Sequence, residues 1–146
     1  MEYKNLSIYL GSKCNANCTY CHRDITNDVS LSTNFLQNIS NNNQLKRIKF
    51  FGGEPTLYLS EMQNIINALP NKDVKKWIST NGLLLTDDQV FNFILKNNII
   101  VTISYDGLRG LRQYKNIFDN VDYLKRLQQL DKIDTSTTIF RNNVFY

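Results

Sequence analysis

The feature that most constrains the fold is a regular alternation of β-type runs with helical patterns along the chain. Runs rich in β-branched and aromatic residues predict strands at residues 6–10, 47–51, 76–80, 99–104 and 135–140. A connection that crosses the sheet is needed between parallel strands but not between antiparallel ones. Because a helical pattern separates each strand from the next, the sequence predicts an α/β fold with one parallel sheet and right-handed crossovers.

Helical patterns fill the intervals between these strands. After the second strand, one apolar face is formed by residues at helical spacing: Met62, Ile65, Ile66 and Leu69. We expect this helix to start at an N-cap on Ser60 and to end at Pro70. The pair Thr86 and Gln89 has the spacing of a capping box, which predicts the start of the next helix. Two more helices are expected, at residues 33–39 and 117–130.

The alternation gives four βα units followed by a fifth strand, with no internal domain boundary in residues 1–146. Domains of about 100 to 150 residues are common, so one domain is expected. The fifth strand would leave one edge of a parallel sheet uncovered, which such proteins rarely do. We therefore expect that the domain either is truncated at its carboxyl end or is completed by another chain.

The composition narrows the class of protein. No run of about 18 apolar residues predicts a membrane span, and the amino terminus lacks the pattern of a signal peptide. The net charge is +4, but the basic residues are scattered along the chain, so nucleic acid is not an expected partner. All three cysteines fall within eight residues, which suits metal ligation in a reducing compartment better than a disulfide framework. We expect a cytoplasmic protein.

The three cysteines follow the first strand. Cys14, Cys18 and Cys21 have three and then two residues between them. One loop of this kind can wrap an iron–sulfur cubane, and three thiolates leave one iron open to another ligand. The alternative is structural zinc with His22 as the fourth ligand, but adjacent Cys21 and His22 make an awkward tetrahedral pair. The iron–sulfur interpretation is therefore preferred, and His22 is expected to pack beside the loop.

Glycine-containing and polar segments follow the next strands, where ligands gather in parallel α/β folds. After the second strand come Gly52, Gly53 and Glu54. The glycines allow close backbone approach, and the carboxylate can accept hydrogen bonds from an ammonium group. The third strand ends at Thr80 and Asn81, whose hydroxyl and amide can bond a ribose or a carboxylate. Ordinary glycine turns and polar turns are the alternatives.

These motifs together resemble the radical S-adenosylmethionine (SAM) superfamily. The resemblance implies one [4Fe-4S] cluster held by Cys14, Cys18 and Cys21, with the amino and carboxylate groups of SAM on the remaining iron. It also implies an incomplete parallel (β/α) barrel, because the family core contains more βα units than this chain shows. Tyr20 would pack near adenine, or would instead shield the cluster. The SAM-binding positions that the resemblance implies are Tyr20, Gly52, Gly53, Glu54, Thr80, Asn81, Ser104 and Asp106.

The Ser-Tyr-Asp-Gly sequence that begins at Ser104 resembles the SPASM-type branch of sulfatase-maturating and peptide-modifying enzymes. This implies reductive cleavage of SAM to a 5′-deoxyadenosyl radical that abstracts hydrogen from a peptide or protein substrate. The cofactors carry that chemistry, so no catalytic side chain is assigned. A reducing partner such as flavodoxin or ferredoxin is expected. Two alternatives stay open: an activating protein for a glycyl-radical enzyme, and a truncated domain that binds the cluster or SAM without turnover.

Overall fold

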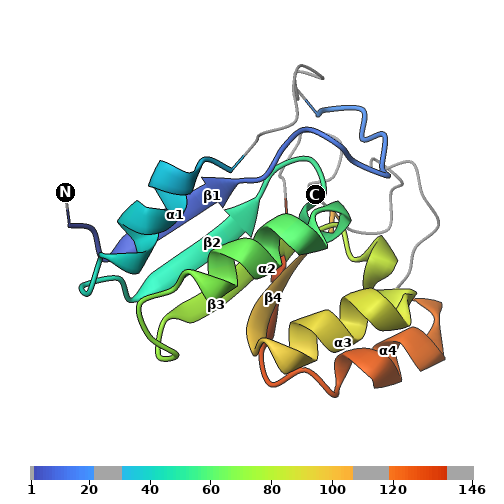
Figure 1. The fold of residues 1–146 in the computed structure, drawn as a ribbon. Helices are drawn as coiled ribbons and strands as arrows, with labels where there is room; N and C mark the ends of the chain where they lie inside the picture. Colours follow the sequence, from blue (N-terminus) through green and yellow to red (C-terminus); the bar gives the residue numbers. More distant parts are fainter. Residues whose placement is uncertain (1, 22–30, 107–118, 138–146) are drawn as a thin grey trace.

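Five parallel strands form the centre of the molecule (Figure 1). The computed structural model describes residues 2–21, 31–106 and 119–137. Its strands are β1 (Asn5–Tyr9), β2 (Arg47–Phe51), β3 (Lys75–Thr80), β4 (Ile99–Ser104) and β5 (Ile133–Ser136). They lie in the order β1-β2-β3-β4-β5, and every neighbouring pair is parallel. The predicted parallel α/β sheet is therefore confirmed.

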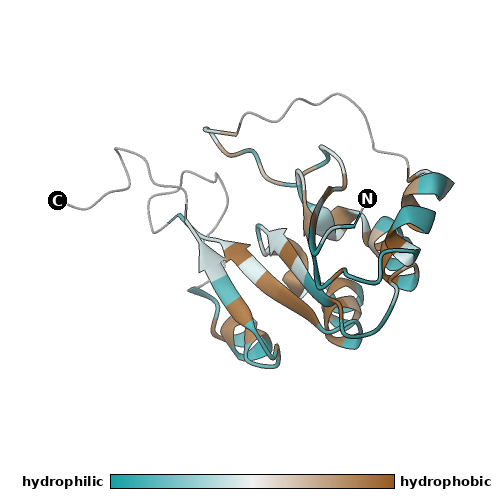
Figure 2. Ribbon diagram, turned by 90° about the vertical axis from the view of Figure 1, so that its left-hand side faces the viewer, coloured by the Kyte–Doolittle hydropathy of each residue, from teal (hydrophilic) through white to brown (hydrophobic). Residues whose placement is uncertain are grey.

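Four α-helices connect the strands: α1 (Thr33–Ser40), α2 (Leu59–Asn67), α3 (Asp88–Lys96) and α4 (Val121–Leu127). They cover one face of the sheet (Figure 1), where alternate strand residues are buried. In β4, for example, Val101 and Ile103 are 0% exposed, whereas Thr102 between them is half-buried. The strands and helices accordingly carry both hydrophobic and hydrophilic residues along their length (Figure 2). No helix in the described ranges is long and apolar enough to cross a bilayer.

We call the opposite side of the sheet the open face. Side chains alternate between the two faces along a strand, and paired residues of neighbouring strands share a face. The open face therefore carries Asn5, Ser7, Tyr9, Arg47, Lys49, Phe51, Lys75, Trp77, Ser79, Ile100, Thr102, Ser104, Asp134 and Ser136. Most of these residues are polar or basic, in contrast to the aliphatic residues that face the helices.

The start of α2 differs from the sequence prediction. Tyr58 is the N-cap residue, and no side chain caps the helix, so the predicted N-cap on Ser60 is wrong. A short 3₁₀ helix at Pro55–Leu57 runs directly into α2 and brings the start forward to Leu59. The helix ends at Asn67, three residues before Pro70, and that is consistent with the bias of residues near a proline away from helical geometry.

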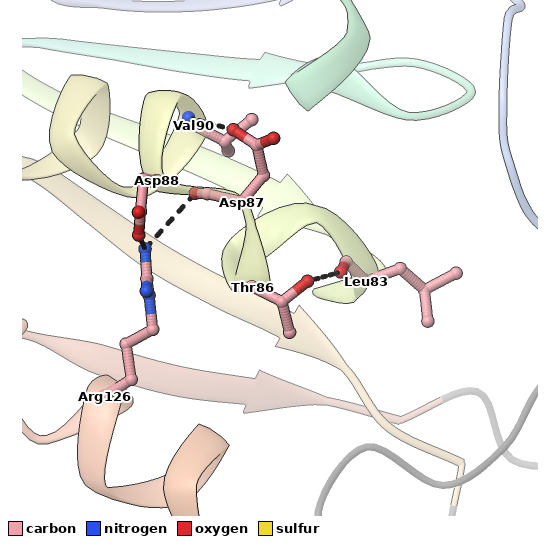
Figure 3. Close-up of polar contacts among 6 residues, drawn as sticks. All are labelled: Leu83, Thr86, Asp87, Asp88, Val90 and Arg126. Atoms are coloured by element: carbon pink, nitrogen blue, oxygen red, sulfur yellow. Dashed lines mark hydrogen bonds and ion pairs between the residues drawn. The ribbon is translucent and has the colours of Figure 1, made fainter.

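The start of α3 also differs, and the predicted capping box on Thr86 and Gln89 is wrong. The Asp87 carboxylate accepts a hydrogen bond from Val90 N at 3.1 Å and is the N-cap (Figure 3). Thr86 instead closes a 3₁₀ turn, because its hydroxyl donates to Leu83 O at 3.0 Å. Because the Thr86 hydroxyl is used in this turn, it does not cap α3, and the N-cap is the next residue, Asp87. Figure 3 also shows Arg126 reaching from α4 to the Asp88 carboxylate, at 2.7 Å.

The last two elements begin or end away from their predicted bounds. Strand β5 starts at Ile133 because its residues pair with β4 from Val101 to Ser104. The predicted strand at 135–140 therefore starts two residues late, and its end lies outside the described residues. Helix α4 is shorter than the predicted 117–130, since Asn120 caps it by accepting from Asp122 N and Tyr123 N. Residues 117 and 118 lie outside the described part of the chain.

Candidate functional site

A cavity of about 480 Å³ opens where the carboxyl ends of the strands meet the open face. Its volume lies within the range of small-molecule sites. The cavity brings together most of the residues that the sequence singled out, from four different strand ends: Cys14, Cys18, Tyr20, Cys21, Gly52, Gly53, Thr80, Asn81 and Ser104. Of the predicted site residues, Glu54 and Asp106 do not line it. The topology therefore assembles one site from segments that are far apart in the sequence.

The cysteine loop, residues 10–21, is joined by its backbone to the segment after β2. Leu10 N donates to Phe51 O at 2.9 Å, Gly53 N donates to Gly11 O at 2.8 Å, and Glu54 N donates to Lys13 O at 2.7 Å. These bonds continue the pairing of β1 with β2 beyond the ends of both strands. These bonds therefore fix residues 10–13, the part of the loop that precedes Cys14.

Glycine is required where these two segments touch. A Cβ on Gly53 would overlap the carbonyl oxygens of Ser12 and Lys13, and a Cβ on Gly52 would overlap Gly11 O. Gly52 also has φ +151°, a conformation that side chains rarely adopt. From the sequence, we expected these glycines to allow a ligand to approach the backbone closely. The structure adds a second reason for them, which is the close contact between two loops of the protein.

Tyr58 supports the cysteine loop, and the sequence analysis missed it. Tyr58 is 4% exposed, and its hydroxyl accepts a hydrogen bond from Lys13 N at 2.8 Å. A Cβ on Gly11 would overlap this hydroxyl, so the tyrosine fills the space that the glycine leaves. The two partners are 45 residues apart in sequence, and no local pattern marks such a contact.

The Glu54 carboxylate is fully buried and is used inside the protein. Its Oε1 accepts from Thr56 N at 3.1 Å, from the Thr56 hydroxyl at 2.5 Å and from the Thr80 hydroxyl at 2.6 Å. Its Oε2 accepts from Asn81 N at 2.8 Å. The sequence analysis expected this carboxylate to receive an ammonium group of SAM. In the structure four protein donors occupy it, so Glu54 joins the end of β2 to the end of β3.

Thr80 and Asn81 both bond to Glu54 in this buried network, and both also line the cavity. The Thr80 hydroxyl donates to Glu54 and accepts from Gly82 N at 3.0 Å, so its proton is used within the protein. The Asn81 side-chain oxygen accepts from Leu83 N at 2.9 Å, which directs the NH₂ group toward the cysteine loop. That group donates to Asn15 Oδ1 at 2.7 Å and lies 3.9 Å from Cys14 Sγ. Asn81 therefore links the third strand end to the first cysteine.

Tyr20 makes the corresponding link to the fourth strand end. Its hydroxyl donates to the carboxylate of Asp106, which is 5% exposed. Tyr20 and Ser104 both line the cavity. The structure thus places Tyr20 on the cavity wall, where both interpretations of it, contact with adenine and shielding of a cluster, remain predictions.

The three cysteines line one cavity. All are free thiols; Cys14 and Cys18 are half-buried and Cys21 is exposed, and all three line the same cavity. Cys14 Sγ also accepts a hydrogen bond from Ala16 N at 3.4 Å. Among the described residues, no three His, Cys, Asp or Glu side chains converge on one ion position. A cubane cluster binds each thiolate to a different iron, so it does not require that convergence. His22, the proposed zinc ligand, lies outside the described residues.

The sequences of curated relatives align with most of this chain. It is 32% identical over 133 residues to the probable GTP 3′,8-cyclase of Methanothermobacter marburgensis, an alignment that covers 85% of this chain and 41% of the relative. It is 28% identical over 149 residues to the radical SAM cyclopropyl synthase TigE of Paramaledivibacter caminithermalis, covering 85% of this chain and 31% of the relative. The chain therefore spans less than half the length of these curated relatives.

Solved structures share the fold at low sequence identity. One is anSMEcpe with bound AdoMet and the Kp18Cys peptide, with a TM-score of 0.63 and 20% identity over 90% of this chain and 42% of that one. Another is Streptococcus suis SuiB bound to its precursor peptide SuiA, with a TM-score of 0.64 and 20% identity over 93% and 33%. The family model described as the Radical SAM superfamily matches residues 8–140. With the three cysteines, Gly52, Gly53 and the third strand end all on one cavity, this match shows that the chain belongs to the radical SAM superfamily.

Proposed function

We propose that this chain is the catalytic core of an enzyme that cleaves SAM reductively and modifies a peptide or protein. The observation that carries the proposal is the cavity, because Cys14, Cys18 and Cys21 line the same space as Gly52, Gly53 and Asn81. A [4Fe-4S] cluster held by these cysteines would supply one electron to the sulfonium of SAM and so generate the 5′-deoxyadenosyl radical that takes a hydrogen atom from the substrate. A flavodoxin or ferredoxin is the proposed source of that electron.

The protein residues bind and orient in this proposal. Gly52 and Gly53 line the cavity, and their carbonyl groups are the proposed acceptors for the amino group of SAM. Asn81 directs its NH₂ group at the cysteine loop, and Ser104 lines the same cavity. Glu54 acts through Thr80 and Asn81 and keeps these segments in register. We assign no acid or base to SAM cleavage, because the cofactors carry the chemistry.

A peptide or protein is the proposed substrate, and two similarities support it. The solved structures with the same fold contain the Kp18Cys peptide and the precursor peptide SuiA. The Ser-Tyr-Asp-Gly sequence that begins at Ser104, the last residue of β4, resembles the peptide-modifying branch. Nucleotide chemistry is the second candidate, because relatives such as that of Methanothermobacter marburgensis are named probable GTP 3′,8-cyclase. The substrate class is therefore the part of the proposal that most needs a direct test.

The test of SAM cleavage is anaerobic reconstitution with iron and sulfide, followed by reduction and measurement of 5′-deoxyadenosine. The wild-type chain should take up a cluster and form 5′-deoxyadenosine, and Cys18→Ala should do neither. Asn17→Ala is the matched control, because Asn17 is an exposed neighbour in the same loop. Cluster uptake without 5′-deoxyadenosine would favour a non-catalytic binding domain, and preferential uptake of zinc would overturn the assignment of the cysteines.

A further inference from the structure

The open face has a one-sided charge distribution. Three basic residues lie on its central strands: Arg47 and Lys49 on β2 and Lys75 on β3. The one carboxylate on the described strands of this face is Asp134 on β5. Strands lie about 4.8 Å apart, so Asp134 is roughly 14 Å from β2 across the sheet. Arg47 and Lys75 lie at the amino ends of their strands, and Lys49 is the one of the three that lines the cavity.

Lys49 is the basic residue that reaches the cavity. Among the described residues that line the cavity, Lys49 is the one Lys, Arg, Asp or Glu. It makes no ion pair with any other described residue. Arg47, by contrast, already stacks over the Trp77 ring, with 5.1 Å between the guanidinium carbon and the ring centroid. Lys49 is therefore the cation left available to a ligand.

The position of Lys49 along β2 favours substrate over cofactor. It lies two residues before Phe51, the last residue of the strand, and thus about 6.6 Å down the face from the loops that carry the cysteines and glycines. Phe51 and Tyr9 form an edge-to-face pair with centroids 5.7 Å apart, and they are 39% and 41% exposed. A ligand that extends from the cavity over the open face would meet this aromatic pair and the lysine together.

We propose that Lys49 is a specificity-determining residue that pairs with a carboxylate of an acidic peptide substrate lying on the open face. This proposal rests on the proposed function and names its substrate class. A single ammonium group matches a single carboxylate, whereas sites for triphosphates combine several donors or a helix N-terminus with cations. The Tyr9–Phe51 pair then contacts an apolar part of the same peptide.

The experiment is selection from a displayed library of random ten-residue peptides on the reconstituted protein. The wild type should enrich peptides with Asp or Glu at one position, and Lys49→Glu should enrich Lys or Arg there instead. Lys72→Glu is the matched control, because it makes the same change of charge on an exposed lysine before β3, at the other end of the sheet. A selected acidic peptide should bind Lys49→Gln at least about tenfold more weakly than wild type.

Each other outcome counts against the proposal. The proposal would be overturned if the selected peptides were not enriched in Asp or Glu, or if Lys49→Glu selected the same peptides as the wild type. Weaker binding of GTP to Lys49→Gln would assign the lysine to a nucleotide, and weaker binding of SAM would assign it to the cofactor. Formation of 5′-deoxyadenosine by the wild type is measured separately, so a failure of the proposed function is distinguishable from a failure of this inference.

Discussion

Replacing Glu54 by glutamine tests the buried carboxylate, because it changes the charge and one hydrogen-bonding group with almost no change in volume. Three donors converge on Oε1 and one on Oε2. An amide offers one acceptor oxygen and one donor NH₂ group. In the better orientation, the oxygen keeps the bonds to Thr56 and Thr80, and the NH₂ group faces Asn81 N. The variant then has two buried donors that point at each other.

The expected magnitude follows from these contacts. A buried donor without a partner costs about 1–3 kcal/mol, and each remaining bond loses roughly 1 kcal/mol when its acceptor becomes neutral. Relief from burying a charge offsets part of this loss. We expect Glu54→Gln to lower the free energy of unfolding by about 2–4 kcal/mol, a large fraction of the 5–15 kcal/mol that is usual for a domain.

The assay is urea unfolding of the anaerobic protein, followed by the fluorescence of Trp77, the one tryptophan of the chain. The control is Glu61→Gln, which makes the same change of charge in the first turn of α2 and should cost at most about 1 kcal/mol. Equal losses in the two variants would refute the reasoning, because the four donors to Glu54 would then contribute nothing measurable.

Three further predictions each concern a single residue. Gly53→Ala should lower the unfolding midpoint in urea, because its Cβ overlaps the Ser12 and Lys13 carbonyls; a midpoint equal to wild type would contradict this. Asp87→Ala should cost about 1 kcal/mol in the same assay as a lost N-cap, and Thr86→Ala should cost less. Burial lowers the pKa of Lys76 from 10.5, so the unfolded chain binds more protons between the lowered pKa and 10.5, and stability rises with pH in that window. Lys76→Met should abolish this rise in pH-dependent unfolding, and Lys75→Met should retain it.

The sequence predicted the parts of the fold that are set by local pattern. Strands β2 and β4 have the bounds that β-branched and aromatic residues predicted, and the cysteine loop is visible because its three ligands are close together in the chain. The helix starts were predicted less well. Short 3₁₀ turns precede α2 and α3, and whether a hydroxyl such as that of Thr86 caps a helix or closes a turn depends on backbone geometry that a pattern does not contain.

The support of the site could not be predicted, because its partners are distant in sequence. The bond from Thr80 to Glu54 spans 26 residues, and the bond from Lys13 to Tyr58 spans 45. The sequence showed that Glu54 carries a carboxylate near a ligand site, but not that four protein donors use it. Residue type and motif therefore predicted residues that the fold brings to one cavity at the strand ends, while the contacts of individual side chains required the packing.

The supports of the cysteine loop also predict how cluster uptake depends on residues that bind no iron. Gly53 N, Glu54 N, the Tyr58 hydroxyl and the Asn81 amide together hold residues 11–15. Ordering a residue costs about 1–2 kcal/mol, so a loop that is already fixed loses less entropy when it binds a cluster. Tyr58→Phe leaves Lys13 N without its acceptor and should lower the affinity for the cluster, seen as less iron and sulfide retained against a chelator. Asp87→Ala, which destabilises the fold away from the loop, should retain the wild-type amount. Equal retention by both variants would show that the tyrosine contributes to global stability alone and does not prepare the cysteine loop.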